Sequence, residues 1–78
     1  MKDSDFDIIV ASDVNERDGI GVEISYQGQF VMEIFRDDTD KTRIITLEDE
    51  QMPLALMEKC IEIFKKNIDW DFIDHKES

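Results

Sequence analysis

The sequence has few of the residues that usually mark a chemical site: one cysteine, one histidine, one proline and three glycines in 78 residues. The single Cys60 excludes an internal disulfide and a zinc site built on thiolates, and it suits a reducing cytosol. The apolar run near the N-terminus, Ile8 to Ala11, is far shorter than the roughly 18 residues needed to span a bilayer. We therefore expect a cytoplasmic chain without a membrane segment, folded as one domain over residues 1–78.

Basic residues are also scarce: nine lysines and arginines stand against 20 acidic residues, and the net charge is −11. A field of this sign repels nucleic acid and anionic membranes, and it attracts basic protein surfaces. Only Lys65 and Lys66 are adjacent, so no basic stripe is available to follow a phosphate backbone. The composition predicts a basic protein partner, with no direct binding to nucleic acid or membrane.

Regular periodicity argues against a disordered acidic tail. Alternating or β-branched segments predict four strands, at residues 6–11, 20–26, 29–35 and 42–47. Because Ile8, Ile9 and Val10 are consecutive, we expect both faces of the first strand to be covered, as in a central strand.

The length of the loop between the second and third strands decides which of their residues lie opposite each other and share a face of the sheet. A two-residue loop, Gln27-Gly28, would set Ser25 opposite Phe30 and mix polar with apolar on one face. A three-residue loop, 26–28, pairs Ile24 with Phe30 and places glycine in the left-handed position. We predict the three-residue loop, with Phe30 on the face that a helix covers.

A helix is predicted from Leu54, with Pro53 in its first turn and Lys65 and Lys66 in its last turn. Its apolar stripe comprises Leu54, Met57, Ile61, Phe64 and Ile68, widened by Leu56 and Cys60. Residues 68–73 alternate apolar and acidic, and both an extended arm and a second helix remain open. The order predicts an α+β fold: a small antiparallel sheet of about four strands with one main helix on one face (ββββα).

No catalytic set is recognisable. His75 lies near the C-terminus among charged residues, where chains usually fray. Cys60 lies on the apolar stripe, which indicates a core residue and not a nucleophile activated by a base. We therefore expect no enzyme and no cofactor.

Two acidic segments resemble metal sites in part. Residues 13–19 (DVNERDG) place their glycine one position late for a calcium loop, and Ile24 occupies the twelfth position. The cluster Asp37, Asp38 and Asp40 lies in a turn, where aspartates commonly bond their own backbone. The turn interpretation is favoured at both places, and no metal site is predicted.

The C-terminal segment sets Trp70 and Phe72 among Asp69 and Asp71. Aromatic residues within a charged rim are typical of binding hot spots, although the same rings can complete a thin core, and both roles are compatible.

The open face of the sheet is a further candidate contact surface. If the helix covers the Phe30 phase, the opposite phase is apolar in part, with acidic neighbours. We expect it to carry Val31, Phe35 and Ile45, ringed by Glu23, Glu33, Arg36 and Asp37. Small proteins rarely expose such a strip without a use, so a homodimer is an alternative.

The stretch from Tyr26 to Asp40 (YQGQFVMEIFRDDTD) and the block from Phe64 to Phe72 (FKKNIDWDF) resemble an arrangement in small acidic immunity proteins. These are bacterial antitoxins of contact-dependent growth inhibition and related polymorphic toxin systems. The resemblance implies a non-enzymatic toxin inhibitor that binds a basic toxin domain, often a nuclease, and occludes its cationic active site.

The predicted partner-binding residues rest on the charge and aromatic argument, not on the resemblance. They are Asp37, Asp38, Asp40, Asp69, Trp70, Asp71 and Phe72. The alternative function is a small interaction or regulatory module that self-associates through its exposed sheet face.

Overall fold

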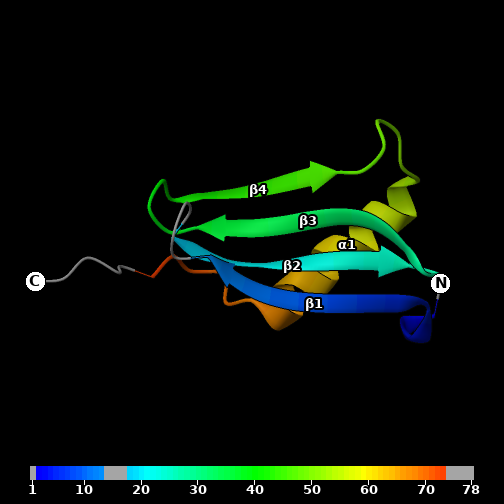
Figure 1. Cartoon of the computed structure of the whole chain (residues 1–78), viewed down its shortest axis with the longest axis horizontal. Coiled ribbons are helices and arrows are strands. Elements are labelled where there is room, and N and C mark those ends of the chain that lie inside the picture. The colour runs from blue at the N-terminus through cyan, green and yellow to red at the C-terminus, as the bar shows by residue number, and fades with distance from the viewer. Residues whose placement is uncertain (1, 14–17, 74–78) are drawn as a thin grey trace, which may run out of the picture.

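The computed structural model describes residues 2–13 and 18–73, and it has the predicted ββββα architecture. Four antiparallel strands form one sheet in the order β1-β2-β3-β4, and α1 packs on one face of it (Figure 1). The elements are a short 3-10 helix η1 (Asp3–Asp5), β1 (Phe6–Asp13), β2 (Gly19–Tyr26), β3 (Gln29–Asp37), β4 (Thr42–Leu47) and α1 (Leu54–Asn67). Within the described ranges, no helix is long and apolar enough to cross a membrane.

The core lies between α1 and the two central strands. Alternate residues of β2 and β3 point toward the helix and are fully buried there, among them Val22, Ile24 and Met32. The facing residues of α1 are Leu56, Cys60, Ile63 and Phe64. Burial of this apolar surface is the main favourable term in a domain of this size.

The predicted central position of the first strand is wrong, because β1 is an edge strand paired only with β2. Ile8, Ile9 and Val10 are 40%, 60% and 47% exposed. Consecutive apolar residues look alike in sequence whether a strand is covered on both faces or lies at a bare edge.

The predicted three-residue hairpin loop is also wrong. Gln27 and Gly28 alone form the loop, and both have positive φ, 50° and 85°. This is the backbone of the two-residue turn that matches the twist of antiparallel strands. Ser25 does pair with Phe30, but a β-bulge at Val31 then shifts the register so that Ile24 pairs with Met32. The bulge, and not a longer loop, brings the apolar faces into phase.

The bulge changes which residues lie on the open face of the sheet. Phe30 shares this face with Ser25, instead of facing the helix as predicted, and Val31 packs against the core. On β4 the residue paired with Phe35 is Ile44, so Ile45 and Arg36 belong to the helix side, contrary to the expected strip.

Phe35 itself is buried on the open face, above the glycines of β2. A Cβ added at Gly21 would lie 2.9 Å from the Phe35 ring and 2.6 Å from the Ile34 carbonyl oxygen. The missing side chain therefore makes room for the ring on the neighbouring strand.

The helix begins at Leu54 as predicted, with Pro53 at its N-cap. Its buried stripe is rotated from the predicted one: Ile63 is buried and was missed, whereas Leu54 is 73% exposed. Lys65 and Lys66 lie in the last turn. The side-chain amide of Asn67 donates to the Ile63 carbonyl oxygen at 2.9 Å and satisfies one of the helix-end acceptors.

Candidate functional site

The helix runs obliquely behind the sheet, from the β4 side toward the β1 side (Figure 1). A narrow helix crossing a four-stranded sheet at an angle leaves a gap on each side. One cavity of about 210 Å³ lies between α1 and β1, and another of about 210 Å³ lies between α1 and β4. The two gaps are filled differently, and this difference defines the candidate site.

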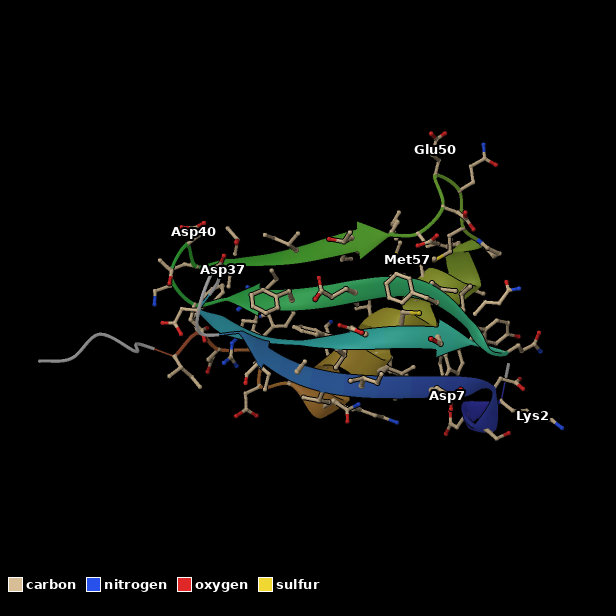
Figure 2. The ribbon with its side chains drawn as sticks, in the orientation of Figure 1. Lys2, Asp7, Asp37, Asp40, Glu50 and Met57 are labelled. Carbon is tan, nitrogen blue, oxygen red and sulfur yellow. The ribbon has the colours of Figure 1, made fainter. Side chains whose placement is uncertain are left out.

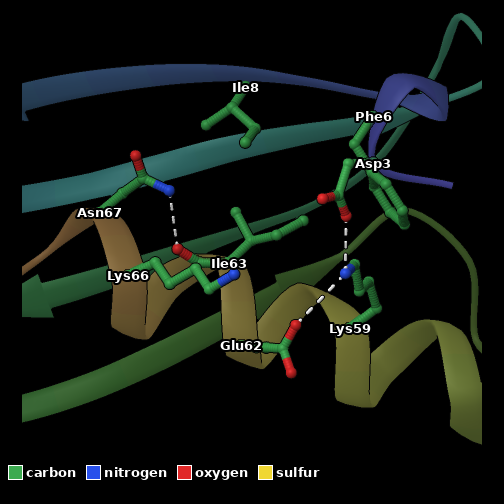
Figure 3. Close-up of a pocket in the computed structure, with 8 residues that line it drawn as sticks. All are labelled: Asp3, Phe6, Ile8, Lys59, Glu62, Ile63, Lys66 and Asn67. Carbon is green, nitrogen blue, oxygen red and sulfur yellow. Dashed lines mark hydrogen bonds and ion pairs between the residues drawn. The ribbon is translucent and has the colours of Figure 1, made fainter.

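The gap beside β1 is bridged by charged groups (Figure 3). The Lys59 ammonium lies 2.8 Å from a carboxylate oxygen of Asp3 and donates to Glu62 at 3.3 Å. The hydrogen bond from Lys59 lowers the pKa of Asp3, and its charge adds to the effect. Phe6, Ile63 and Asn67 also line this gap. Ion pairs between exposed groups contribute little energy, but the Asp3–Lys59 pair ties η1 to the helix across the gap.

The end of the sheet away from η1 is covered by a C-terminal arm, residues 68–73, which is not helical (Figure 1). The structure thus has the arm and not a second helix. Ile68 is buried in the core and its amide donates to the Phe64 carbonyl oxygen, which ends α1. Beyond Ile68, the backbone of the arm is held by the side chains of Arg36 on β3 and Arg43 on β4.

Arg36 is the first of these, and only 3% of it is exposed. Its Nε and Nη2 donate to the two carboxylate oxygens of Asp38 at 2.8 and 3.1 Å, and its Nη1 donates to the Asp69 carbonyl oxygen at 2.8 Å. The Asp38 carboxylate also accepts a hydrogen bond from the Ile73 amide at 3.1 Å. A buried bidentate pair thus holds both ends of the arm.

Arg43 is the second. It is the cross-strand partner of Arg36 and bonds the next carbonyl of the arm, that of Trp70, through Nε and Nη2 at 3.1 and 2.7 Å. Its guanidinium lies 3.7 Å from the centre of the Trp70 ring and 4.2 Å from that of Phe72. Such cation–π contacts are strongest where the groups are partly desolvated. Trp70 also meets Phe64 edge-on at 6.5 Å, and half of its surface is exposed.

The predicted partner-binding residues separate into two groups. Asp37 and Asp38 are buried: Asp37 accepts from the amides of Thr39 and Asp40, both at 3.0 Å, as the turn interpretation predicts, and Asp38 holds Arg36. The carboxylates that face solvent are those of Asp40, Asp69 and Asp71. Trp70 and Phe72 belong to the arm, where both rings contact Arg43. Whether any of them binds a partner stays a prediction.

Sequence reasoning missed both arginines that position the arm. A signal was present, since Arg36 follows Met32 and Ile34 in the phase that faces the helix, and Asp38 follows two residues later. A charge in an otherwise apolar phase indicates a buried pair or a buried hydrogen-bonding role.

A second exposed acidic group was not singled out as a site. Glu48, Asp49 and Glu50 are exposed and follow the end of β4. Figure 2 shows Glu50 at one end of β4 and Asp40 at the other. Exposed carboxylates therefore lie beyond both ends of β4, the strand that borders the α1–β4 gap. Its own lining is largely apolar: Ile34, Ile45, Ile61, Phe64 and Trp70, with Arg43.

The other sequence candidates are resolved only in part. Cys60 is fully buried in the core as predicted, and burial raises the pKa of its thiol. Within residues 2–13 and 18–73, no group of three or more histidine, cysteine or acidic side chains is arranged to hold a metal ion. Residues 14–17 of the calcium-like loop and His75 lie outside the described residues.

Comparison of the chain with protein-family models, with curated proteins and with solved structures finds no match.

Proposed function

We propose that this protein is an immunity-type inhibitor, which binds a basic toxin domain, a nuclease, and covers its cationic active site. The observation that carries the proposal is a set of solvent-facing carboxylates: Asp69 and Asp71 flank the half-exposed Trp70 in the arm, and Asp40 is exposed in the turn after β3 (Figure 2), which Asp38 ties to the arm through the Ile73 amide. These groups are additional to the buried Asp37 and Asp38, which the fold itself uses.

The arm suits this role because it is held in place before a partner arrives. Arg36 and Arg43 bond its consecutive carbonyls, so Asp69 and Asp71 project from a fixed backbone. Preorganised groups lose less conformational entropy on binding than mobile ones. Trp70 supplies a rigid aromatic surface between Asp69 and Asp71, with Arg43 and Lys65 against its ring. Tryptophan and arginine are enriched among the residues that dominate binding energy at interfaces.

Charge supplies rate and orientation. Complementary fields can raise association to about 10⁸–10⁹ M⁻¹s⁻¹ at low salt, and the gain declines with ionic strength. A carboxylate-rich surface can occupy a cleft that otherwise binds phosphates, because both are oxygen anions that pair with arginine and lysine. Inhibition then requires no chemistry from the inhibitor.

The test begins with capture of the partner at low salt and continues with the captured protein expressed alone and with this chain. The captured protein is expected to be basic, to bind one to one, and to slow bacterial growth only when expressed alone. A captured protein whose toxicity this chain does not suppress would overturn the proposal.

Charge-reversed variants locate the contact. Asp69→Lys with Asp71→Lys is expected to lower the association rate at least about tenfold and to flatten its salt dependence. The matched control is Asp7→Lys with Glu23→Lys, which makes the same charge change at exposed positions of the open sheet face. An association rate of the wild type that does not respond to salt would contradict the electrostatic mechanism.

Self-association is a second candidate function, because Ile9, Phe30 and Ile44 are each at least 40% exposed on the open face. Against it, the same face carries the carboxylates of Asp7 and Glu23. A two-fold contact would bring these like charges of two copies together, which is unfavourable. Sedimentation equilibrium at high micromolar concentration decides the matter, since a monomer there removes this candidate.

A further inference from the structure

The outer edge of β4 has hydrogen-bonding groups without a strand beside them. Among residues 2–13 and 18–73, β4 is the last strand of the sheet and pairs with β3 alone. The Glu48 amide donates to the Val31 carbonyl oxygen. Because hydrogen-bonded and non-hydrogen-bonded pairs alternate between antiparallel strands, this bond shows which residues of β4 bond to β3. Thr42, Ile44 and Thr46 therefore direct their backbone groups to β3, and Arg43, Ile45 and Leu47 direct theirs outward.

The residues with outward backbone groups have their side chains on the helix side of the sheet. Their partners on β3, which face the helix, are Arg36 for Arg43, Ile34 for Ile45 and Met32 for Leu47. A strand added at this edge would place its residues opposite Ile45 and Leu47 on that side too, next to the α1–β4 gap. Both are a little over one third exposed, so their apolar surface is only partly covered by the fold.

The size of the gap fits side chains better than a free small molecule. Its volume of about 210 Å³ is below the 300–1,000 Å³, roughly, that is typical of small-molecule sites. An edge strand beside an apolar groove is the arrangement by which strand addition recognises peptides: main-chain bonds give affinity, and alternate side chains enter the groove.

The two edges of the sheet are not equivalent. Beside β1, the Asp3–Lys59 ion pair bridges the gap, and Lys59 also bonds Glu62 of its own helix (Figure 3). Beside β4, the gap has a largely apolar lining, and exposed carboxylates lie beyond both ends of the strand: Asp40 before it and Glu48–Glu50 after it (Figure 2). The cations near it, Arg43 and Lys65, lie over the Trp70 ring.

We infer that the edge of β4 and the α1–β4 groove bind an extended segment of the basic partner, which joins the sheet as a fifth strand. Its alternate apolar side chains enter the groove, and its flanking lysines or arginines meet the carboxylates at the two ends. This inference rests on the proposed function for the identity of the partner, and it names the kind of segment that is recognised.

The probe is a synthetic nine-residue peptide with alternating valine and threonine in its centre and two lysines at each end. Amide hydrogen exchange of the protein is followed by NMR with and without it. The amides of Ile45 and Leu47 are expected to become protected, because they gain strand partners, whereas those of Ile8 and Val10 on the β1 edge are not. Protection at β1, or no protection at either edge, overturns the inference.

A proline variant tests the backbone contact. Ile45→Pro removes an amide that points away from β3, where proline is tolerated in an edge strand. It is expected to weaken peptide binding about tenfold. Val10→Pro is the matched control. Because the Gln27 amide bonds the Asp5 carbonyl oxygen, every second residue of β1 from Asp5 bonds to β2, and the Val10 amide, which lies between two such residues, points outward. Equal losses in the two variants, or tight binding of a peptide with glutamates in place of the lysines, would refute the inference.

The two proposals fail in different ways. If Ile45→Pro neutralises the toxin domain as well as the wild type does, while the reversal at Asp69 and Asp71 abolishes neutralisation, strand addition is wrong and the inhibitor function stands. If the captured protein is not neutralised at all but the peptide still protects β4, the inhibitor function is wrong and the docking edge stands. Protection of β4 that rises with protein concentration alone identifies a second copy as the occupant and overturns the inference.

Discussion

Substitution of Asp38 by asparagine tests the contact that joins the arm to the sheet. The change keeps the shape of the side chain but removes the charge that faces Arg36, whose guanidinium is buried. Loss of one partner of a buried ion pair typically costs about 3–5 kcal/mol, because the other charge remains uncompensated. A domain of this length has a free energy of unfolding of roughly 4–12 kcal/mol, so the loss is a large part of it.

Urea unfolding measures the effect. With a denaturant slope of about 1–3 kcal/mol/M, a loss of about 3 kcal/mol lowers the midpoint by about 1–3 M. The control is Asp40→Asn, an exposed residue of the same turn, for which we expect a change within about 0.5 kcal/mol. An Asp38→Asn midpoint equal to that of the control would show that the buried pair does not hold the fold as argued.

Fluorescence separates the arm from the rest of the fold. Trp70 is the only tryptophan and lies on the arm, where it contacts Phe64 and Arg43. In the wild type, fluorescence and far-ultraviolet circular dichroism should report one transition. In Arg36→Met, which also removes the bond to the Asp69 carbonyl, the fluorescence transition should come first. Coincident transitions in that variant would mean that the arm is held mainly by Arg43 and by its own rings.

Three further predictions concern other parts of the fold. Cys60 should react with a thiol reagent only as fast as the protein opens, because the thiol is buried and burial raises its pKa; immediate labelling of the native protein would contradict its packing. The pKa of Asp3 is lowered by Lys59, so the contribution of this pair is present at neutral pH and is lost as the pH falls through the pKa of folded Asp3. Lys59→Met should therefore raise that pKa in a carboxyl NMR titration, and an unchanged titration would argue against the ion pair. Gly21→Ala should lower the free energy of unfolding by about 1–3 kcal/mol in thermal melts, because the new methyl group would lie 2.6 Å from the Ile34 carbonyl oxygen, and full stability would mean that the strands separate easily there.

Local pattern was sufficient for the strands, the helix and their order. Alternation along β2 is an effect of side chains pointing to opposite faces, and the three-and-four spacing along α1 is an effect of the helical turn. Neither depends on distant residues, so the fold class could be predicted from the sequence.

Pairing and burial were predicted less well, because they depend on residues far apart in the chain. The run Ile8–Val10 does not reveal whether a strand lies beyond it. The bulge at Val31 resolves a parity conflict that a longer loop would also resolve, and only the backbone angles of Gln27 and Gly28 distinguish the two solutions.

The candidate site was predicted in part for the same reason. The aromatic and acidic alternation of residues 69–72 marked the arm as unusual. Its position is set by Arg36 and Arg43, which are 33 and 27 residues away from the carbonyls they bond. Such distant pairs leave no periodic trace in a single sequence.

The arm also sets an order of events during synthesis. Residues 69–73 leave the ribosome after the sheet and the helix that they bind. Until then, the guanidinium groups of Arg36 and Arg43 lack the carbonyl oxygens that accept their hydrogen bonds in the folded state. Nascent chains that stop before the arm would consequently leave Arg43 without the Trp70 carbonyl oxygen, whereas Arg36 would still be paired with Asp38. The carboxylates of Asp69 and Asp71 therefore join those of Asp40 and Glu48–Glu50 only when the arm closes onto the sheet.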